Sequence, residues 1–266
     1  MGKFRDFIVR AALTLSLLVP VYFAVAALGT KFGLLDWRIG FGLMTFRFGI
    51  FVFAGAAAFA LLALLVALVA PPRRGVFAAL LALAIPGAGM GYGAYVRQQA
   101  QAIPPIHDIS TDLIDPPAFS QAVVAARAAV PGGNDLDLLN KRTGDGRAFV
   151  DLQREAYGDI QPVSTAQSPR AAFDAALALA ETQGWTIARA DAAAGVIEAT
   201  ATTFWYGFTD DIVIRVRPEG EGARVDARSV SRVGRSDLGA NAARLRPYLA
   251  ELRARLVVDM HAALLE

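Results

Sequence analysis

The sequence predicts a membrane α-helical bundle of three transmembrane helices joined to a soluble α+β domain with an antiparallel sheet. Long apolar runs occupy the first hundred residues, whereas the later part shows a helix, several alternating strands and a final helix. A stretch with two proline pairs separates these two parts. The expected boundaries are a three-helix transmembrane domain at 1–98, a Pro-rich strap at 99–118 and the α+β domain at 119–266.

Three apolar runs, at residues 7–28, 41–70 and 76–96, are long enough to cross a bilayer, since about 20 residues are needed. Pro20 lies inside the first run and would kink that helix, which membrane helices tolerate. We expect the first run to be retained as a helix, because it is long for the apolar region of a cleaved signal peptide.

The charges of the loops indicate an orientation. Five basic residues fall on one side of the membrane and three on the other if all three runs span it. Because basic loops stay in the cytoplasm, we expect a cytoplasmic N-terminus in a bacterial inner membrane, with a periplasmic soluble domain. The first group is Lys3, Arg5, Arg10, Arg73 and Arg74; the second is Lys31, Arg38 and Arg97.

Composition also excludes some classes of function. The first hundred residues carry nine basic and two acidic side chains, and the remainder carries 17 basic and 22 acidic ones. The soluble part is therefore acidic, which argues against nucleic acid as a partner. The absence of cysteine excludes disulfides, thiolate metal sites and a cysteine nucleophile.

Two features of the apolar runs invite a functional interpretation. Arg47 is an intramembrane charge and hence a site hypothesis, but we favour a side chain that reaches the nearby interface. The glycines of the third run form two small-xxx-small pairs, Gly87/Gly91 and Gly89/Gly93. Helix packing is favoured over a phosphate loop, because the Lys-Ser/Thr ending and a preceding strand are missing.

The strap combines proline pairs with His107, Asp108, Asp112 and Asp115. These residue types bind metals or perform acid–base chemistry, yet their spacing matches no known metal site. The favoured interpretation is an ordered segment that docks on the domain through Asx turns and carboxylate–arginine pairs. We therefore predict no metal and no cofactor.

The C-terminal pattern predicts an antiparallel sheet with helices on one face. Ser168 caps a helix that Pro169 begins, and alternation of apolar and polar residues marks the strands. Residues 157–163 are expected to be extended. The expected helices lie at 119–130, 168–184 and 238–265, and the strands at 185–189, 196–202, 211–217 and 223–232.

Charged residues gather where the strands meet the final helix. Arginines here could bind an anion or a lipid headgroup, whereas the favoured alternative is a set of Asp–Arg pairs that hold the strap and helix to the sheet. Trp205 lies in an aromatic cluster at 204–208 that could form a ligand wall, a membrane contact or core, the commonest use. The candidate ligand-binding residues are Arg215, Arg217, Arg228, Arg232, Arg244, Asp210, Asp211 and Trp205.

Three long segments resemble motifs of a bacterial family known as domain-of-unknown-function family 1499. The opening motif is PPIHDISTD…DPPAF at 104–119, the central one GFTDDIVIRV at 207–216 and the closing one SVSRVGRSDLGANAAR at 229–244. The resemblance covers about residues 101–255, and the helical prefix is similar to that of membrane-anchored members. It supports the domain boundaries and implies no reaction or ligand.

The leading hypothesis is a non-enzymatic envelope protein that binds a lipid, a small anion or a protein partner at the membrane surface. Its basis is the membrane tether, the arginine-rich junction and the lack of a nucleophile–base constellation such as Gly-x-Ser-x-Gly. One alternative is an accessory subunit of a larger membrane complex that docks through the third helix. Another is a metal-dependent or acid–base hydrolase that uses His107, Asp108, Asp112, Asp210 and Asp211.

Overall fold

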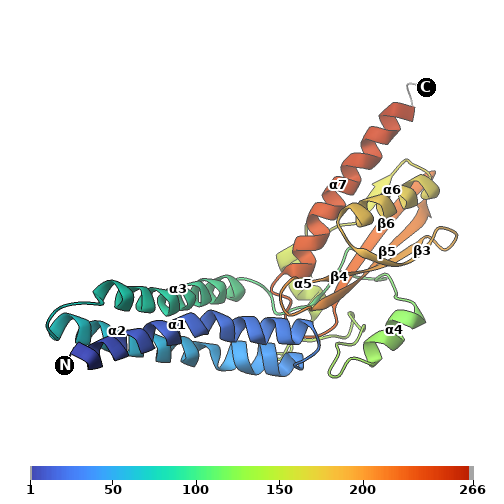
Figure 1. Cartoon of the computed structure of the whole chain (residues 1–266). Helices are drawn as coiled ribbons and strands as arrows, with labels where there is room; N and C mark the ends of the chain where they lie inside the picture. Colours follow the sequence, from blue (N-terminus) through green and yellow to red (C-terminus); the bar gives the residue numbers. More distant parts are fainter. Residues whose placement is uncertain (1, 264–266) are drawn as a thin grey trace. The chain divides into compact units, whose positions relative to one another are not determined.

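The computed structural model describes residues 2–263, with side chains up to Val257, and the chain forms two compact units (Figure 1). The first, here called the helical unit, comprises residues 2–102 together with the short segment Thr203–Gly207. The second, the sheet unit, comprises Ile103–Thr202 and the residues from Phe208 onward.

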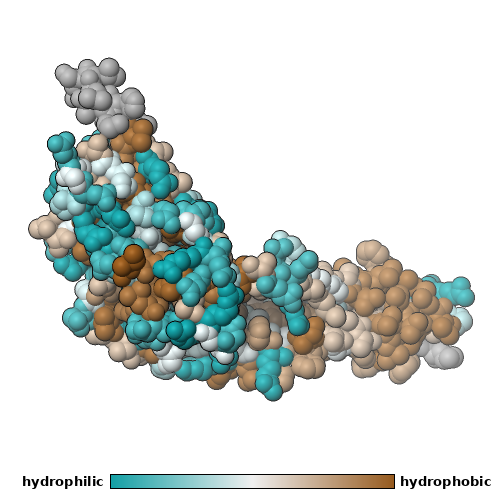
Figure 2. Space-filling model, turned by 180° about the vertical axis from the view of Figure 1, so that it is seen from behind, coloured by the Kyte–Doolittle hydropathy of each residue, from teal (hydrophilic) through white to brown (hydrophobic). Residues whose placement is uncertain are grey.

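The helical unit contains the three predicted long apolar helices, and the second predicted run, 41–70, is divided between a π-helix and an α-helix. Three of its helices are long and apolar enough to cross a membrane, and Figure 2 shows hydrophobic side chains over much of its visible surface. Apolar side chains on the outside of a helical bundle are typical of a lipid environment, because lipid tails are as apolar as these side chains. The helices are α1 (Gly2–Lys31), the π-helix η1 (Arg38–Arg47), α2 (Gly49–Val69) and α3 (Val76–Gln101).

Small side chains let these helices approach closely. Buried alanines of α2 and α3 pack together, among them Ala60, Ala63 and Ala79. A Cβ added at Gly89 would overlap the ring of Phe53 on α2. A Cβ added at Gly87, Gly91 or Gly93 of α3 would have no heavy atom within 4 Å. Only one of the four predicted packing glycines therefore serves contacts inside this unit.

Two arginines of the helical unit lie at its ends. Arg47 is the last residue of η1 and is exposed, so it precedes the span Gly49–Val69. Arg5, only 3% exposed, donates hydrogen bonds to the carbonyl oxygens of Ala70 and Pro72 and pairs with Asp6 at 2.6 Å. This buried arginine thus ties the start of α1 to the α2–α3 turn.

The sheet unit confirms the predicted antiparallel α+β architecture. Five of its six strands run in the order β1-β6-β5-β4-β3, and the sixth, β2, also pairs with β6. The strands are β1 (Asp108–Ser110), β2 (Val163–Thr165), β3 (Thr186–Asp191), β4 (Val196–Thr202), β5 (Thr209–Glu219) and β6 (Gly222–Ser231). The helices are α4 (Gln121–Ala128), α5 (Phe149–Tyr157), α6 (Pro169–Thr182) and α7 (Ala240–Ala263).

Both faces of the sheet are covered, which corrects the expectation of helices on one face alone (Figure 1). On one face, α6 and α7 bury the main core, in which Ile212 and Ile214 of β5 pack with Leu179 and Leu252. On the other face, α4 and the segment before it form a smaller cluster around Phe119. We call these the helix face and the strap face.

Two short strands and α5 were not predicted. Residues 157–163, expected to be extended, instead contain the end of α5 at Tyr157 and the first residue of β2 at Val163. Because β1 and β2 have three residues each, neither shows the alternation by which a strand is identified.

Candidate ligand-binding site

The strap docks as an edge strand. Asp108–Ser110 pairs with β6, and the Thr111 N–H donates to the Ala227 carbonyl oxygen at 2.9 Å. On its other side, the buried amide of Gln153 from α5 takes the place of a further strand. Its Nε2 donates to the Ser110 carbonyl oxygen at 2.6 Å, and its Oε1 accepts from the Ser110 N–H at 3.1 Å.

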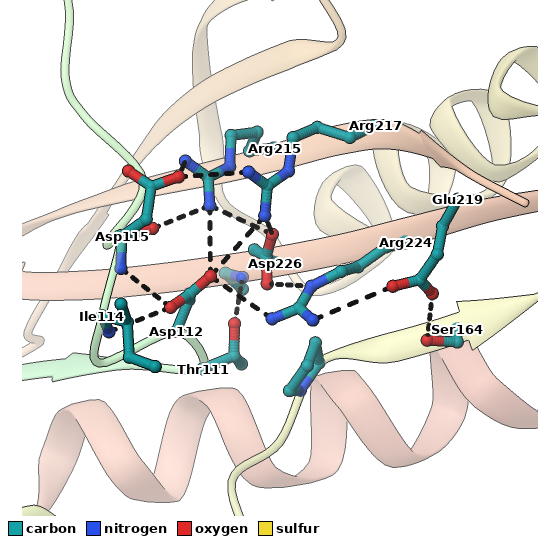
Figure 3. A network of polar contacts seen from close by, with 12 residues as sticks. Thr111, Asp112, Ile114, Asp115, Ser164, Arg215, Arg217, Glu219, Arg224 and Asp226 are labelled. Atoms are coloured by element: carbon teal, nitrogen blue, oxygen red, sulfur yellow. Dashed lines mark hydrogen bonds and ion pairs between the residues drawn. The ribbon is translucent and has the colours of Figure 1, made fainter.

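Three arginines on the strap face surround one buried carboxylate (Figure 3). Asp226 is fully buried and accepts from Arg215 at 3.2 Å, Arg217 at 2.9 Å and Arg224 at 3.0 Å. The β5–β6 register sets Arg217 directly opposite Arg224, a repulsive pair by itself. The carboxylate between them makes this arrangement tolerable.

The strap supplies two more carboxylates to the same arginines (Figure 3). Asp115 accepts from Arg215 at 2.9 Å and from Arg217 at 3.1 Å, and Asp112 accepts from Arg224 at 3.3 Å. Burial of Asp112 would raise its pKa, but hydrogen bonds from the backbone of Asp115 and Ile114, and then the arginines, hold that pKa below its usual value. The predicted carboxylate–arginine docking of the strap is thus present in atomic detail.

Consecutive residues of one strand point to opposite faces, and this separates Asp210 from Asp211. On the helix face, Arg244 of α7 donates to Asp210 at 2.6 Å. On the strap face, Asp211 accepts from Arg127 at 2.6 Å and from Arg232 at 2.7 Å. The two aspartates that the sequence places side by side therefore belong to different clusters.

Arg228, another of the predicted arginines, pairs with the strap carboxylate of Asp108, and both side chains are buried. Arg228 makes a two-pronged contact with Asp108 at 2.8 and 2.9 Å, and the two side chains are 5% and 0% exposed. Arg228 also donates to the Pro117 and Leu136 carbonyl oxygens. All five predicted arginines thus contact a carboxylate, while Trp205 belongs to the helical unit. Ligand binding by this set stays a prediction.

A cavity of about 650 Å³ opens beside His107, the one predicted strap residue with no arginine partner among those described. The His107 side chain is 5% exposed, its ring packs edge-on against Phe149 with 5.1 Å between centroids, and its Nδ1 has no hydrogen-bond partner in the described chain. The strap carries His107, and the segment 134–149 supplies most of the other lining residues.

The electrostatics of the cavity favour a neutral imidazole. Desolvation by burial, followed by the positive charge of Lys141, lowers the pKa of His107 to about 4. Lys141 donates to the Asp135 carbonyl oxygen at 2.7 Å and pairs with the Asp135 carboxylate at 3.0 Å. Arg235, at the cavity wall, is exposed and makes no ion pair within the part of the chain that the structure describes.

The chemical capacity of this cavity follows from these groups. A neutral imidazole can exchange one hydrogen bond with a ligand, and Arg235 presents a guanidinium that suits a carboxylate or phosphate. Arg142 adds a second guanidinium to the wall. Among the described residues, no three His, Asp or Glu side chains gather as metal ligands.

Sequence reasoning missed several residues that build these clusters. Arg127 and Gln153 are buried and bonded, yet neither lies in a motif. Asn241 lies in the closing motif at 229–244 and is buried, but it was not named as a candidate residue. Asn241 donates from Nδ2 to the His107 carbonyl oxygen at 3.1 Å and so fixes the strap beside the cavity. Lys141 and Asn134 lie in a polar segment without periodicity, so no signal in the sequence places them at His107.

A family model described as protein of unknown function (DUF1499) matches residues 108–252. The match begins at the first residue of β1 and ends within α7, so it includes the strap from Asp108 onward, the whole sheet and the segment 134–149 that lines the cavity. His107 lies directly before the matched residues. Comparison with curated proteins gives no match.

Proposed function

The chain belongs to the family of proteins of unknown function DUF1499, and we propose that its sheet unit is a non-enzymatic binding module that takes a small anion in the cavity beside His107. The three apolar helices hold this module at a membrane surface. The anion is a phosphate or carboxylate group, either free in solution or part of a lipid headgroup.

The observation that carries this proposal is the combination of one buried, unbonded imidazole nitrogen and one uncompensated guanidinium in a single cavity. Buried polar atoms without partners are rare in folded proteins and call for an explanation. A ligand that bonds to His107 Nδ1 and accepts from Arg235 would satisfy both groups.

Support for binding rather than hydrolysis comes from the carboxylates. Asp108, Asp210 and Asp211 each bond to an arginine at 2.9 Å or less. In each case a guanidinium group occupies a carboxylate oxygen that a substrate or water would otherwise contact. The aspartates named for acid–base chemistry thus have structural partners.

The first test is native mass spectrometry of the full chain in mild detergent, before and after removal of lipid, followed by calorimetric titration with inorganic phosphate and with a short-chain anionic phospholipid. Arg235→Ala removes the free guanidinium. Arg170→Ala removes an exposed cation on α6 that pairs with Asp174, and it serves as the matched control.

We expect Arg235→Ala to weaken binding about tenfold or more, as loss of a charge-assisted hydrogen bond predicts, and Arg170→Ala to leave it unchanged. Retention of a lipid by the wild type would indicate a headgroup, and binding of phosphate alone would indicate a free anion. Equal affinities for the two variants, or no binding of either probe, would refute the proposal.

A further inference from the structure

The segment Thr203–Gly207, here called the aromatic loop, joins β4 to β5 in the sequence and yet belongs to the helical unit. Its Tyr206 Oη lies 2.6 Å from Thr45 Oγ1, and its ring meets Phe41 edge-on at 5.2 Å between centroids. Tyr206 and Gly207 both have positive φ, 61° and 67°. A tyrosine seldom adopts this conformation, so its contacts with η1 hold the loop in a specific shape.

With Tyr206 directed at η1, the other two rings of the loop remain uncovered. Phe204 is 69% exposed and Trp205 is 57% exposed, and the two rings meet edge-on at 4.9 Å. Lys31, the last residue of α1, places its Nζ 4.4 Å from the centroid of Phe204. Two large aromatic rings that are exposed side by side favour a surrounding that is less polar than bulk water, because much of each ring is apolar.

The position of the loop on the helical unit indicates that surrounding. Its contacts are with the end of α1 and with η1, where Phe32 and Leu34 are also exposed and where Lys31, Asp36 and Arg38 carry charges. A band in which aromatic rings mix with basic side chains at the end of an apolar span is typical of the membrane–water interface. A lysine there can lay its stem along apolar groups and keep its ammonium in water.

We propose that the aromatic loop is a membrane-interface anchor whose Phe204 and Trp205 rings enter the headgroup region of the bilayer that α1, α2 and α3 span. The loop that connects two strands of the sheet unit thereby becomes part of the membrane-embedded surface. This inference does not rest on the proposed anion site, because it uses none of the cavity residues.

The absence of cysteine from the chain allows a direct test on the full-length protein in liposomes. Single cysteines at Trp205→Cys and, as a control in the exposed β5–β6 turn, at Glu221→Cys would carry a nitroxide spin label. Collisions of each label with oxygen, which concentrates in lipid, and with a water-soluble nickel chelate would be measured.

We expect the label at 205 to collide several-fold more with oxygen than with the chelate, and the label at 221 to show the reverse. A water-like profile at both positions would overturn the proposal, and so would a label at 205 that neither reagent reaches, since that result would mean contact with protein.

A second measurement avoids the label. Brominated lipids quench tryptophan in the bilayer, so they should quench the wild type more than Trp205→Phe. Equal fractional quenching of these two proteins would also count against the anchor.

Discussion

His107 illustrates how one residue can combine a structural and a chemical role. Its carbonyl oxygen accepts from Asn241 and from the Ser231 N–H, which fixes the strap, while its imidazole faces the cavity. Burial and the nearby Lys141 lower its pKa from 6.5 to about 4. The ring therefore stays neutral over the whole physiological range, with one nitrogen as a donor and the other as an acceptor.

The environment of His107 predicts that the free energy of unfolding depends on pH. Unfolded chains protonate His107 as the pH falls through about 6.5, whereas the folded protein does so only near 4. The associated contribution to the free energy of unfolding is thus fully present above pH 6.5 and is lost as the pH falls toward 4. In NMR spectra of histidine-labelled full chain, one of the two imidazoles should titrate near pH 4, and this resonance should vanish in His107→Phe. A midpoint near 6.5 for that resonance would contradict the assigned environment.

The ion pairs between the strap and the sheet differ in burial, so they should differ in their contribution to the free energy of unfolding. Arg228 and Asp108 are nearly inaccessible, whereas Arg217 is 39% exposed and shares its carboxylates with Arg215 and Arg224. Removal of one partner from a buried pair leaves an uncompensated charge and costs about 3–5 kcal/mol. Loss of an exposed pair costs about 1 kcal/mol or less.

Arg228→Met should therefore destabilise the sheet unit strongly, and Arg217→Met only slightly. Urea denaturation of the full chain in detergent, followed by near-ultraviolet circular dichroism, measures the difference. Similar transition midpoints for the two variants would show that the buried pair does not hold the strap.

The strands and helices that the sequence predicts are those with a local signal. β4 matches its predicted bounds, and α6 begins where Ser168 caps it, with the Ala171 N–H donating to the Ser168 hydroxyl at 3.2 Å. By contrast, β1 depends on pairing with β6, more than a hundred residues later. The cavity was not predicted because its walls join the strap, an aperiodic segment and Arg235, which come together only in the tertiary structure.

At the scale of the whole molecule, the placement of basic residues around the apolar spans bears on topology. The basic side chains in the first turns of α1 and in the α2–α3 turn favour the cytoplasm. With three spans, we therefore predict that the sheet unit lies on the other side of the membrane. Gly2→Cys and Glu221→Cys provide one reporter for each side. In intact cells, a membrane-impermeant maleimide should label position 221 and not position 2; labelling of position 2 alone would mean the inverted arrangement.

The edges of the sheet bear on how tethered copies behave toward each other. Confinement to a bilayer brings identical chains into frequent lateral encounter, and an unprotected strand edge would invite them to pair and aggregate. One edge, β3, carries a register shift between Ile187 and Arg189 and a charged Arg189–Asp191 pair. The opposite edge is formed by β1 and β2, which have three residues each. The side-chain amide of Gln153 forms hydrogen bonds with the backbone N–H and carbonyl oxygen of Ser110 in β1. Both edges are therefore poor templates for a neighbouring copy, so a crowded membrane can hold many of these domains in soluble form.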